Sequence, residues 1–360
     1  MYKKIMVRAI IISGVVVSQV VLFWGLDILA KKTLLPNIAF EQPYRLHGES
    51  GDVQGAYALS KNSSYLAWIN GGVLYVEDLV ARRCCYRGEQ KTDSFVWLPD
   101  RSRLVFVSEN QLYSLDLEGE VRLNRETEAQ LPEGYTYTQI AVSTYSNLIY
   151  LMGAGPEGRQ DILIIDLTKK LRYVDNQDDL SFSRLAVVNK TGSLVIQAET
   201  RDGPRLLHWA ENTLTLISDD GGIGDAILLG TNDRGFYGGR IDREADCFRT
   251  VYYYVNEAAG VLEEPVAIWQ GELPMSAEFL PFATGAGLLV SPEENGESEA
   301  YVIKMVWGAN HEMGLPRIHV LGLPLFREAG APRPVCRVFA ANGLTYLEIS
   351  GDQYCWRLLP

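Results

Sequence analysis

The chain has 360 residues, and its 33 basic and 45 acidic residues give a net charge of −12. This acidity disfavours nucleic-acid binding, because a negatively charged protein surface repels a phosphate backbone. The 33 glycines, 19 tyrosines and 7 tryptophans are typical of an all-β protein, and no long, regular amphipathic run after residue 40 predicts a helix.

The N-terminal segment predicts a membrane anchor. Residues 9–26 contain no charge, and Lys3, Lys4 and Arg8 precede them. A spanning helix needs about 17–25 residues, and the positive-inside rule places the N-terminus in the cytoplasm. We therefore expect residues 1–32 to form a cytoplasmic stub and a transmembrane signal-anchor and residues 33–43 to form a stalk. Residues 44–360 are then the extracytoplasmic domain of a single-pass protein in the cytoplasmic membrane.

Cleavage of the same segment as a signal peptide is the alternative, because Ile28-Leu29-Ala30 loosely fits the end of a cleavage site. The uncharged stretch exceeds the usual signal-peptide core of about 7–15 residues, which favours the anchor. Both alternatives export the domain, either anchored or secreted. Residues 33–360 then hold 28 basic and 44 acidic residues, a net charge of −16, so we expect cationic partners or divalent metals rather than anionic lipid.

A repeat of short strands follows the anchor. Three segments share an apolar pattern that ends in Asp-Leu, at 74–79, 112–117 and 162–167. Each follows another β-rich run across a polar or Gly-containing turn, at 65–69, 103–107 and 147–151. Two such runs predict a hairpin, and a period of about 40–50 residues built from short strands is typical of propeller blades.

We expect an all-β fold, a β-propeller of seven blades in one closed domain. The number comes from seven equivalent second-strand starts, at Tyr65, Arg103, Asn147, Ser193, Gly235, Gly287 and Gly343. Six or eight blades remain open, because residues 252–268 show no clear hairpin spacing. The last strand-like run, 353–358, would leave an open edge, and we expect residues 43–47 to join it and close the ring.

The five cysteines, an odd number, match no zinc spacing: Cys84, Cys85, Cys247, Cys336 and Cys355. If residues 342–343 and 351–352 form two-residue turns, Cys336 lies opposite Ile349 and Cys355 lies opposite Glu348. The two cysteines are then two strands apart, beyond the Cα separation of roughly 7 Å that a disulfide allows. We expect buried or reduced thiols.

No segment predicts a catalytic or cofactor-binding residue. Gly153–Gly158 matches a dinucleotide fingerprint, but a strand follows it instead of the required helix, which indicates a hairpin loop. No nucleophile elbow occurs. The histidines are scattered, at His47, His208, His311 and His319.

Two acidic loops, 175–179 and 219–225, cluster the oxygen ligands that calcium prefers and leave metal binding open. Such turns are also ordinary between strands. The aromatic residues Phe95, Trp97 and 252–254 could form a binding surface, but aromatics that alternate in strands favour packing between blades.

Two stretches resemble TolB-type propeller repeats, a WD-like family that also forms the N-terminal domain of dipeptidyl peptidase IV and prolyl oligopeptidase relatives. They are 60–68 with the following 74–79, and 97–106 with the following 112–117. Pro99-Asp100 matches the Pro-Asp turn of the family, and the Asp after the outer strand is matched by Asp78, Asp116 and Asp166. Lys61-Asn62 and Thr144-Tyr145 depart from the pattern. The resemblance covers about residues 54–173.

The resemblance implies an exported scaffold that binds protein or peptide, and the chain leaves no room for the hydrolase domain of the peptidases. We therefore expect a non-catalytic interaction module, without cofactor, for an envelope or membrane protein or a peptide. The alternative is a propeller enzyme or ligand-binding protein for glycans or small molecules. Its site would draw polar side chains from at least three blades to one channel mouth.

Overall fold

The computed structural model describes residue 19 and residues 44–46, 57–117, 124–156, 158–175, 180–217, 226–256, 261–275, 278–282, 285–290, 298–306, 317–325, 336–339, 345–350 and 353–358. The chain divides into two compact units, Met1–Gln42 and Pro43–Pro360. No helix within the described residues is long and apolar enough to cross a membrane. The predicted anchor, apart from Gln19, and the stalk lie outside the described residues.

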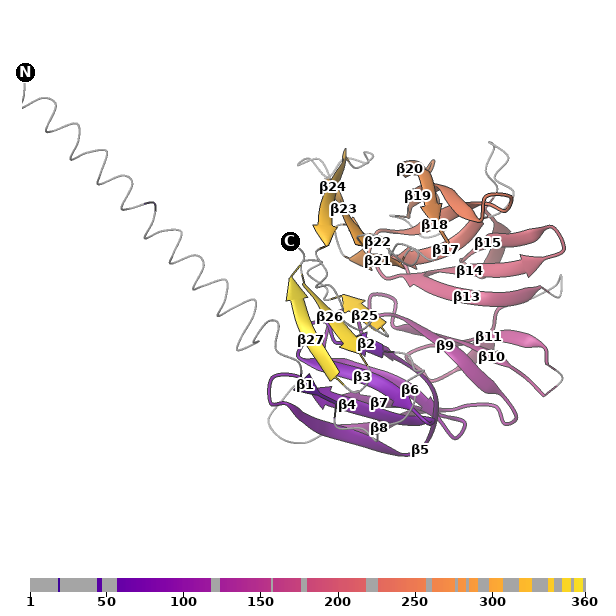
Figure 1. Cartoon of the computed structure of the whole chain (residues 1–360). Helices are drawn as coiled ribbons and strands as arrows, with labels where there is room; N and C mark the ends of the chain where they lie inside the picture. The colour runs from indigo at the N-terminus through magenta and orange to yellow at the C-terminus, as the bar shows by residue number, and fades with distance from the viewer. Residues whose placement is uncertain are drawn as a thin grey trace, which may run out of the picture. The chain divides into compact units, whose positions relative to one another are not determined.

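The described elements of the second unit are antiparallel β-strands that pair mostly in sequence order (Figure 1). Sheets I and II share the long strand β5 and form one continuous seven-stranded sheet. Its strands are β2 (Tyr57–Leu59), β3 (Tyr65–Asn70), β4 (Val73–Asp78), β5 (Arg83–Trp97), β6 (Arg103–Ser108), β7 (Gln111–Asp116) and β8 (Asn124–Gln130). Sheet I consists of β2, β3, β4 and the first part of β5, and sheet II consists of the second part of β5, β6, β7 and β8.

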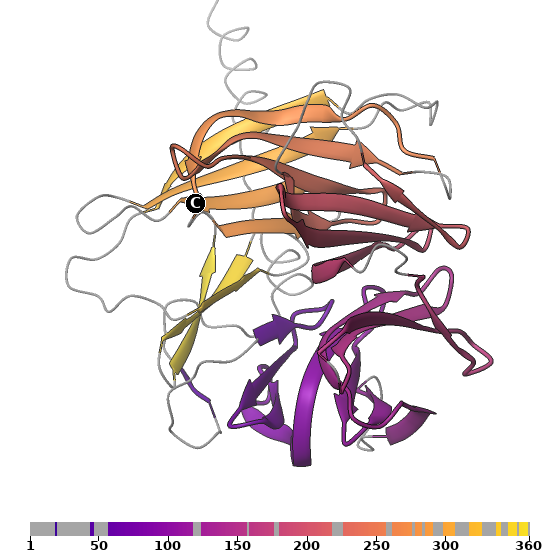
Figure 2. The ribbon, with the colours of Figure 1, turned by 90° about the vertical axis from the view of Figure 1, so that its right-hand side faces the viewer.

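Four further sheets have four strands each, and the strands of each sheet lie side by side in Figure 2. Sheet III contains β9 (Thr136–Ser143), β10 (Leu148–Ala154), β11 (Gln160–Ile165) and β12 (Leu171–Tyr173). Sheet IV contains β13 (Ser181–Val188), β14 (Ser193–Thr200), β15 (Gly203–Ala210) and β16 (Thr213–Leu216). Sheet V contains β17 (Ala226–Thr231), β18 (Gly235–Asp242), β19 (Cys247–Val255) and β20 (Val266–Pro274). Sheet VI contains β21 (Glu278–Phe282), β22 (Gly285–Val290), β23 (Ser298–Val306) and β24 (Arg317–Leu325).

The last sheet, VII, joins the first and the last strands of the second unit. It contains β25 (Cys336–Phe339), β26 (Thr345–Ser350) and β27 (Gln353–Leu358), and β1 (Tyr44–Arg45) pairs with β27. Tyr44 lies opposite Tyr354, which confirms the predicted strand from 43–47. The predicted register is also correct, because Cys336 pairs with Ile349 and Cys355 with Glu348.

The observed starts of the second strands confirm the predicted hairpins. β3, β6, β14 and β18 begin at the predicted Tyr65, Arg103, Ser193 and Gly235, and the other described second strands begin within two residues of the predicted starts. Residues 252–268 contain the end of β19 and the start of β20, and the long connection between these strands explains why no hairpin spacing is visible there.

The cores lie between neighbouring sheets. Val105 of sheet II packs with Leu151 of sheet III in one buried cluster, and Tyr150 packs with Phe182 of sheet IV in the next. The alternation of side chains along a strand supplies one apolar layer to each neighbour, and each fully buried side chain of this kind stabilises the fold by about 1.5–3 kcal/mol. The first strands are neighbours as well, with β9 in contact with β5 and β13, and β17 in contact with β13 and β21.

Two of the aspartates that match the repeat pattern cap the turns that follow their strands. Asp78 Oδ1 accepts hydrogen bonds from the backbone N–H groups of Val80 and Ala81, and Asp166 Oδ1 accepts from those of Thr168 and Lys170. Asp242 caps a turn in the same way. That turn joins the second and third strands of sheet V, so this capping is not confined to the repeat position.

Candidate functional site

The turns between the first and second strands lie at the same end of the strands in the successive sheets. We call them the first turns, and in sheets I–V they are residues 60–64, 98–102, 144–147, 189–192 and 232–234. In a four-stranded antiparallel sheet, the turn between the third and fourth strands lies at this same end of the strands. Residues 166–170 of sheet III are such a third turn.

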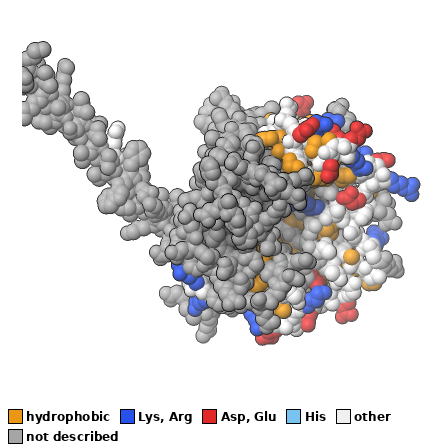
Figure 3. Space-filling view, in the orientation of Figure 1, with side chains coloured by type: hydrophobic (Ala, Val, Ile, Leu, Met, Phe, Trp, Pro, Cys, Tyr) orange, Lys and Arg blue, Asp and Glu red, His pale blue; other side chains and the backbone are white. Residues whose placement is uncertain are grey.

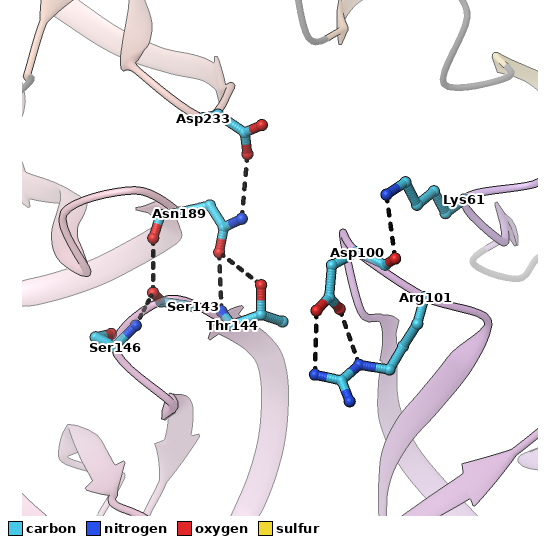
Figure 4. A network of polar contacts seen from close by, with 8 residues as sticks. All are labelled: Lys61, Asp100, Arg101, Ser143, Thr144, Ser146, Asn189 and Asp233. Atoms are coloured by element: carbon cyan, nitrogen blue, oxygen red, sulfur yellow. Dashed lines mark hydrogen bonds and ion pairs between the residues drawn. The ribbon is translucent and has the colours of Figure 1, made fainter.

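Hydrogen bonds tie the first turns of sheets III, IV and V together, as Figure 4 shows. Asn189 Oδ1 accepts from Thr144 N at 2.8 Å, and Ser143 Oγ donates to the Asn189 backbone carbonyl at 2.8 Å. Asn189 Nδ2 then donates to Asp233 Oδ1 at 3.1 Å. Asn189 is buried, so these bonds satisfy polar groups that water does not reach.

The first turns of sheets I and II are also connected. Lys61 Nζ donates to the Asp100 carbonyl at 3.1 Å, on the other side of Figure 4. Trp97 Nε1 donates to the Ala58 carbonyl at 2.9 Å, so the buried indole satisfies its donor across the two sheets.

Between sheets II and III, the first turns flank a cleft of about 250 Å³. Apolar residues of both sheets line it, including Leu98, Val105, Val142, Ile149 and Ile165, and Arg101, Arg103, Glu128, Thr144 and Lys169 are among its polar residues. In Figure 4, Arg101 is held by Asp100 on the sheet II side, with Thr144 across from it on sheet III. The cleft therefore joins an apolar floor to a charged rim.

The acidic groups of this cleft are already engaged. Glu128 accepts from Arg103 at 2.8 Å and from Ser114 Oγ at 2.6 Å. Hydrogen bonds from the Thr168 side chain and the Lys170 backbone hold the pKa of Asp166 below its usual value. Lys169 Nζ donates to the Thr127 carbonyl at 3.2 Å, and an ammonium has two more N–H donors.

An exposed leucine marks the rim. Leu167 lines the cleft and is 74% exposed, and Tyr145 in the first turn of the same sheet is 66% exposed.

On the face that Figure 3 shows, basic and acidic side chains are interspersed over the described part. The net negative charge of the sequence is therefore not gathered into one region of that face.

A second polar group lies on β9 and β13, which are first (inner) strands, and on the neighbouring second strand β14. We call it the inner-strand cluster: Gln139, Ser183, Arg184, Gln197 and Glu199. Gln139 bridges to the first strand of sheet IV, because its Nε2 donates to the Ser183 carbonyl and its Oε1 accepts from Leu185 N. Gln197 Oε1 accepts from Leu228 N, and Arg184 Nη1 donates to the Leu228 carbonyl. β13 carries a bulge at Ser183, which re-aims these side chains.

The three cysteines whose side chains are described and the glycine-rich motif agree with the sequence prediction. Cys84, Cys85 and Cys247 are free thiols. Burial raises the pKa of Cys84 and raises that of Cys85 to about 12, so neither is a ready nucleophile at neutral pH. Gly155 and Gly158 lie in the hairpin turn between β10 and β11, where the Gly155 N–H donates to the Arg159 carbonyl.

Of the histidines, the described side chains include His208 alone, which is buried, and desolvation lowers its pKa. Of the predicted aromatic residues, Trp97, Tyr253 and Tyr254 are buried, and Phe95 and Tyr252 are partly buried and pack against the cores. No group of three metal-ligating side chains occurs within the described part of the chain. Both acidic loops lie outside the described residues except for Asp175.

Neither polar site was predicted from the sequence. The cleft combines residues about 70 positions apart in the chain, from Leu98 to Lys169, and no spacing rule connects them. The departure of Thr144-Tyr145 from the repeat pattern was the one available signal, because that turn borders the cleft.

Comparison with known proteins defines the fold. No protein-family model and no curated protein sequence matches the chain. A streptogramin B lyase structure is similar with a TM-score of 0.55 at 9% identity, over 88% of this chain and 97% of that one. A chain of the mitotic checkpoint complex is similar with a TM-score of 0.52 at 10% identity, over 90% and 96%. The fold is a β-propeller. TolB from Acinetobacter baumannii also matches, with a TM-score of 0.43 at 13% identity, over 71% of this chain and 62% of that one.

Identities this low show the fold alone. The two similarities above a TM-score of 0.5 agree with the β-propeller that the sequence predicts, and they assign no activity to this chain.

Proposed function

We propose that this protein is a membrane-anchored, extracytoplasmic β-propeller of seven blades that acts as a non-catalytic scaffold for an envelope protein or a peptide. The seven blades correspond to sheets I–VII, with β5 shared by the first two. The uncharged N-terminal segment supports the anchor, and the positive-inside rule supports export.

The cleft between sheets II and III is the observation that carries the docking proposal. A volume of about 250 Å³ is smaller than the roughly 300–1,000 Å³ of a typical ligand pocket. It suits one or two apolar side chains of an extended peptide. The spare donors of Lys169 complement the carbonyl or carboxylate groups of such a peptide, because the carboxylates of the cleft are engaged internally.

Site-specific photo-crosslinking in native membranes tests this function. A photoreactive residue in place of Leu167 should give a discrete adduct, whose crosslinked position in the partner is apolar. The matched control is Leu216, which is 56% exposed on the outer strand β16 and should give no such adduct. A synthetic peptide of the crosslinked segment should bind the purified chain and lose binding with Leu167→Asp. Equal labelling from both positions would remove the cleft as the docking site.

Topology requires a separate test. A reporter that is active only outside the cytoplasm should work when fused after Pro360. Activity of a cytoplasmic reporter at the same position would contradict export.

The alternative, a propeller enzyme or ligand-binding protein for glycans or small molecules, requires polar side chains from several blades at one channel mouth. Where the structure describes side chains, the charged residues on the inner strands come from two sheets: Asp93 on the part of β5 that pairs with β6, and Arg184 on β13. Gln139 on β9 adds an uncharged polar side chain from a third sheet. The scaffold is the favoured function because the cleft that carries it offers an apolar floor to a docked side chain.

A further inference from the structure

The inner-strand cluster contains an arginine with no acidic partner among the described residues. Arg184 donates from Nη1 to the Leu228 carbonyl at 2.7 Å, and within the described residues it forms no ion pair. A guanidinium has five N–H donors and stays charged. Arg184 is exposed to water, yet surrounding protein atoms desolvate it enough to lower its pKa. An enclosed cation of this kind is stabilised by any anion that reaches it.

Glu199 is an acid in the same cluster that has no cationic partner in the described part of the chain. Its Oε1 accepts from Ser183 Oγ at 2.8 Å and from Gln197 Nε2 at 2.9 Å, and it forms no ion pair in the part of the chain that the structure describes. Glu199 is exposed, as Arg184 is. The carboxylate is thus oriented by two neutral donors while its charge remains uncompensated.

The two opposite charges are close but separate. Arg184 pairs with Gln197 across β13 and β14, and Glu199 lies two residues further along β14. Diagonal neighbours of this kind have Cα atoms about 7–8 Å apart. The two side chains form no ion pair with each other: Arg184 donates to the Leu228 carbonyl, and Glu199 accepts from Ser183 and Gln197.

The position of β13 among the inner strands makes this cluster accessible to a solute. β13 is a first strand and contacts the first strands β9 and β17 on either side. An exposed side chain on such a strand faces the solvent enclosed by the inner strands of the propeller. The contact to the Leu228 carbonyl places the Arg184 charge on the side of sheet IV that faces sheet V. Gln197 contacts Leu228 N on the same side, and Glu199 shares its face of β14 because the two residues are two positions apart.

We propose that the inner-strand cluster binds a small zwitterion, such as a free amino acid or a dipeptide, with its carboxylate on Arg184 and its ammonium on Glu199. The ligand bridges the gap between the two charges and compensates both. Charge-assisted hydrogen bonds of this type are the strongest that a polar site offers. This site is separate from the cleft between sheets II and III, so it stands or fails independently of the proposed scaffold function.

Titration calorimetry on the full chain in detergent tests the site with four probes: L-alanine, L-alanyl-L-alanine, acetate and ethylammonium. At least one zwitterion should bind, and each half-ligand should bind at least about tenfold more weakly. Arg184→Gln and Glu199→Gln keep hydrogen-bonding groups at both positions and remove one charge each, so each should weaken zwitterion binding at least about tenfold. The control Arg243→Gln, on the exposed turn between β18 and β19, should bind as the parent chain does.

Thermal unfolding of each variant shows whether it remains folded. Failure of both zwitterions to bind at about 10 mM would overturn the proposal. Binding that acetate reproduces in full, or that neither charge-removing variant weakens, would overturn it as well. An ethylammonium affinity equal to that of L-alanine would also exclude the bridging mode.

Discussion

Neighbouring blades of this propeller meet in two different ways. Sheets III, IV and V are tied at their first turns by a buried hydrogen-bond network centred on Asn189. Sheets II and III share an apolar core, but their first turns flank a cleft with a charged rim. The same repeat thus gives a closed interface or an open one, depending on a few turn residues. Polar turn residues that reach the next blade close the interface, and turn residues that pair within their own sheet leave room for a partner.

The largest expected effect comes from opening the ring. Deleting residues 43–47 removes β1 and leaves β27 with an unpaired edge. The shortened chain should aggregate or lose substantial thermal stability, measured by light scattering and by the melting midpoint. Hydrogen exchange should rise more in the first turn of sheet II than in those of sheets III–V, because the network holds only the latter. Unchanged melting of a monomer would mean that the C-terminal strands close the ring alone.

A single substitution tests the closed interface. Asn189→Ala removes the acceptor of Thr144 N and the donor to Asp233 in a buried setting. We expect a loss of about 2–3 kcal/mol in the free energy of unfolding. The control at the cleft, Asp100→Ala, breaks only the exposed pair with Arg101 and should cost less than about 0.5 kcal/mol. Denaturant unfolding measures both, and equal losses would remove the distinction between the two interfaces.

A substitution of Asp116 tests whether this aspartate of sheet II caps its turn as Asp78 and Asp166 cap theirs. It ends β7 at the position that Asp78 holds at the end of β4. If its carboxylate caps turn amides, Asp116→Ala should destabilise the fold by about 1–2 kcal/mol. An unchanged melting curve would reduce Asp116 to a surface residue.

The smallest expected effect is a pH dependence at Asp166, on the other wall. The pKa of its carboxyl is lowered by the Thr168 side chain and the Lys170 backbone. Its stabilising contribution is therefore present above the unfolded pKa of about 3.9 and is lost as the pH falls through the folded value. Asp166→Asn should melt below the parent chain at neutral pH, and the two curves should converge in strong acid. A gap that stays constant with pH would show that the charge is not responsible.

The local part of this structure could be predicted from the sequence. Strand starts such as Tyr65 and Ser193, the register of Cys336 and Cys355, and the pairing of β1 with β27 all follow from alternation, turn residues and the need to cover an edge. These rules act within one hairpin or one sheet, so a short stretch of sequence contains the information.

The polar sites were decided by the tertiary structure alone. The cleft depends on how the first turns of sheets II and III approach each other, and the charges of Arg184 and Glu199 depend on which atoms of sheets IV and V they meet. The amino-acid sequence determines that these side chains are polar and that they lie on or near strand ends. Whether each finds a partner is set by contacts between blades, because residues far apart in the chain become neighbours only when the sheets pack together.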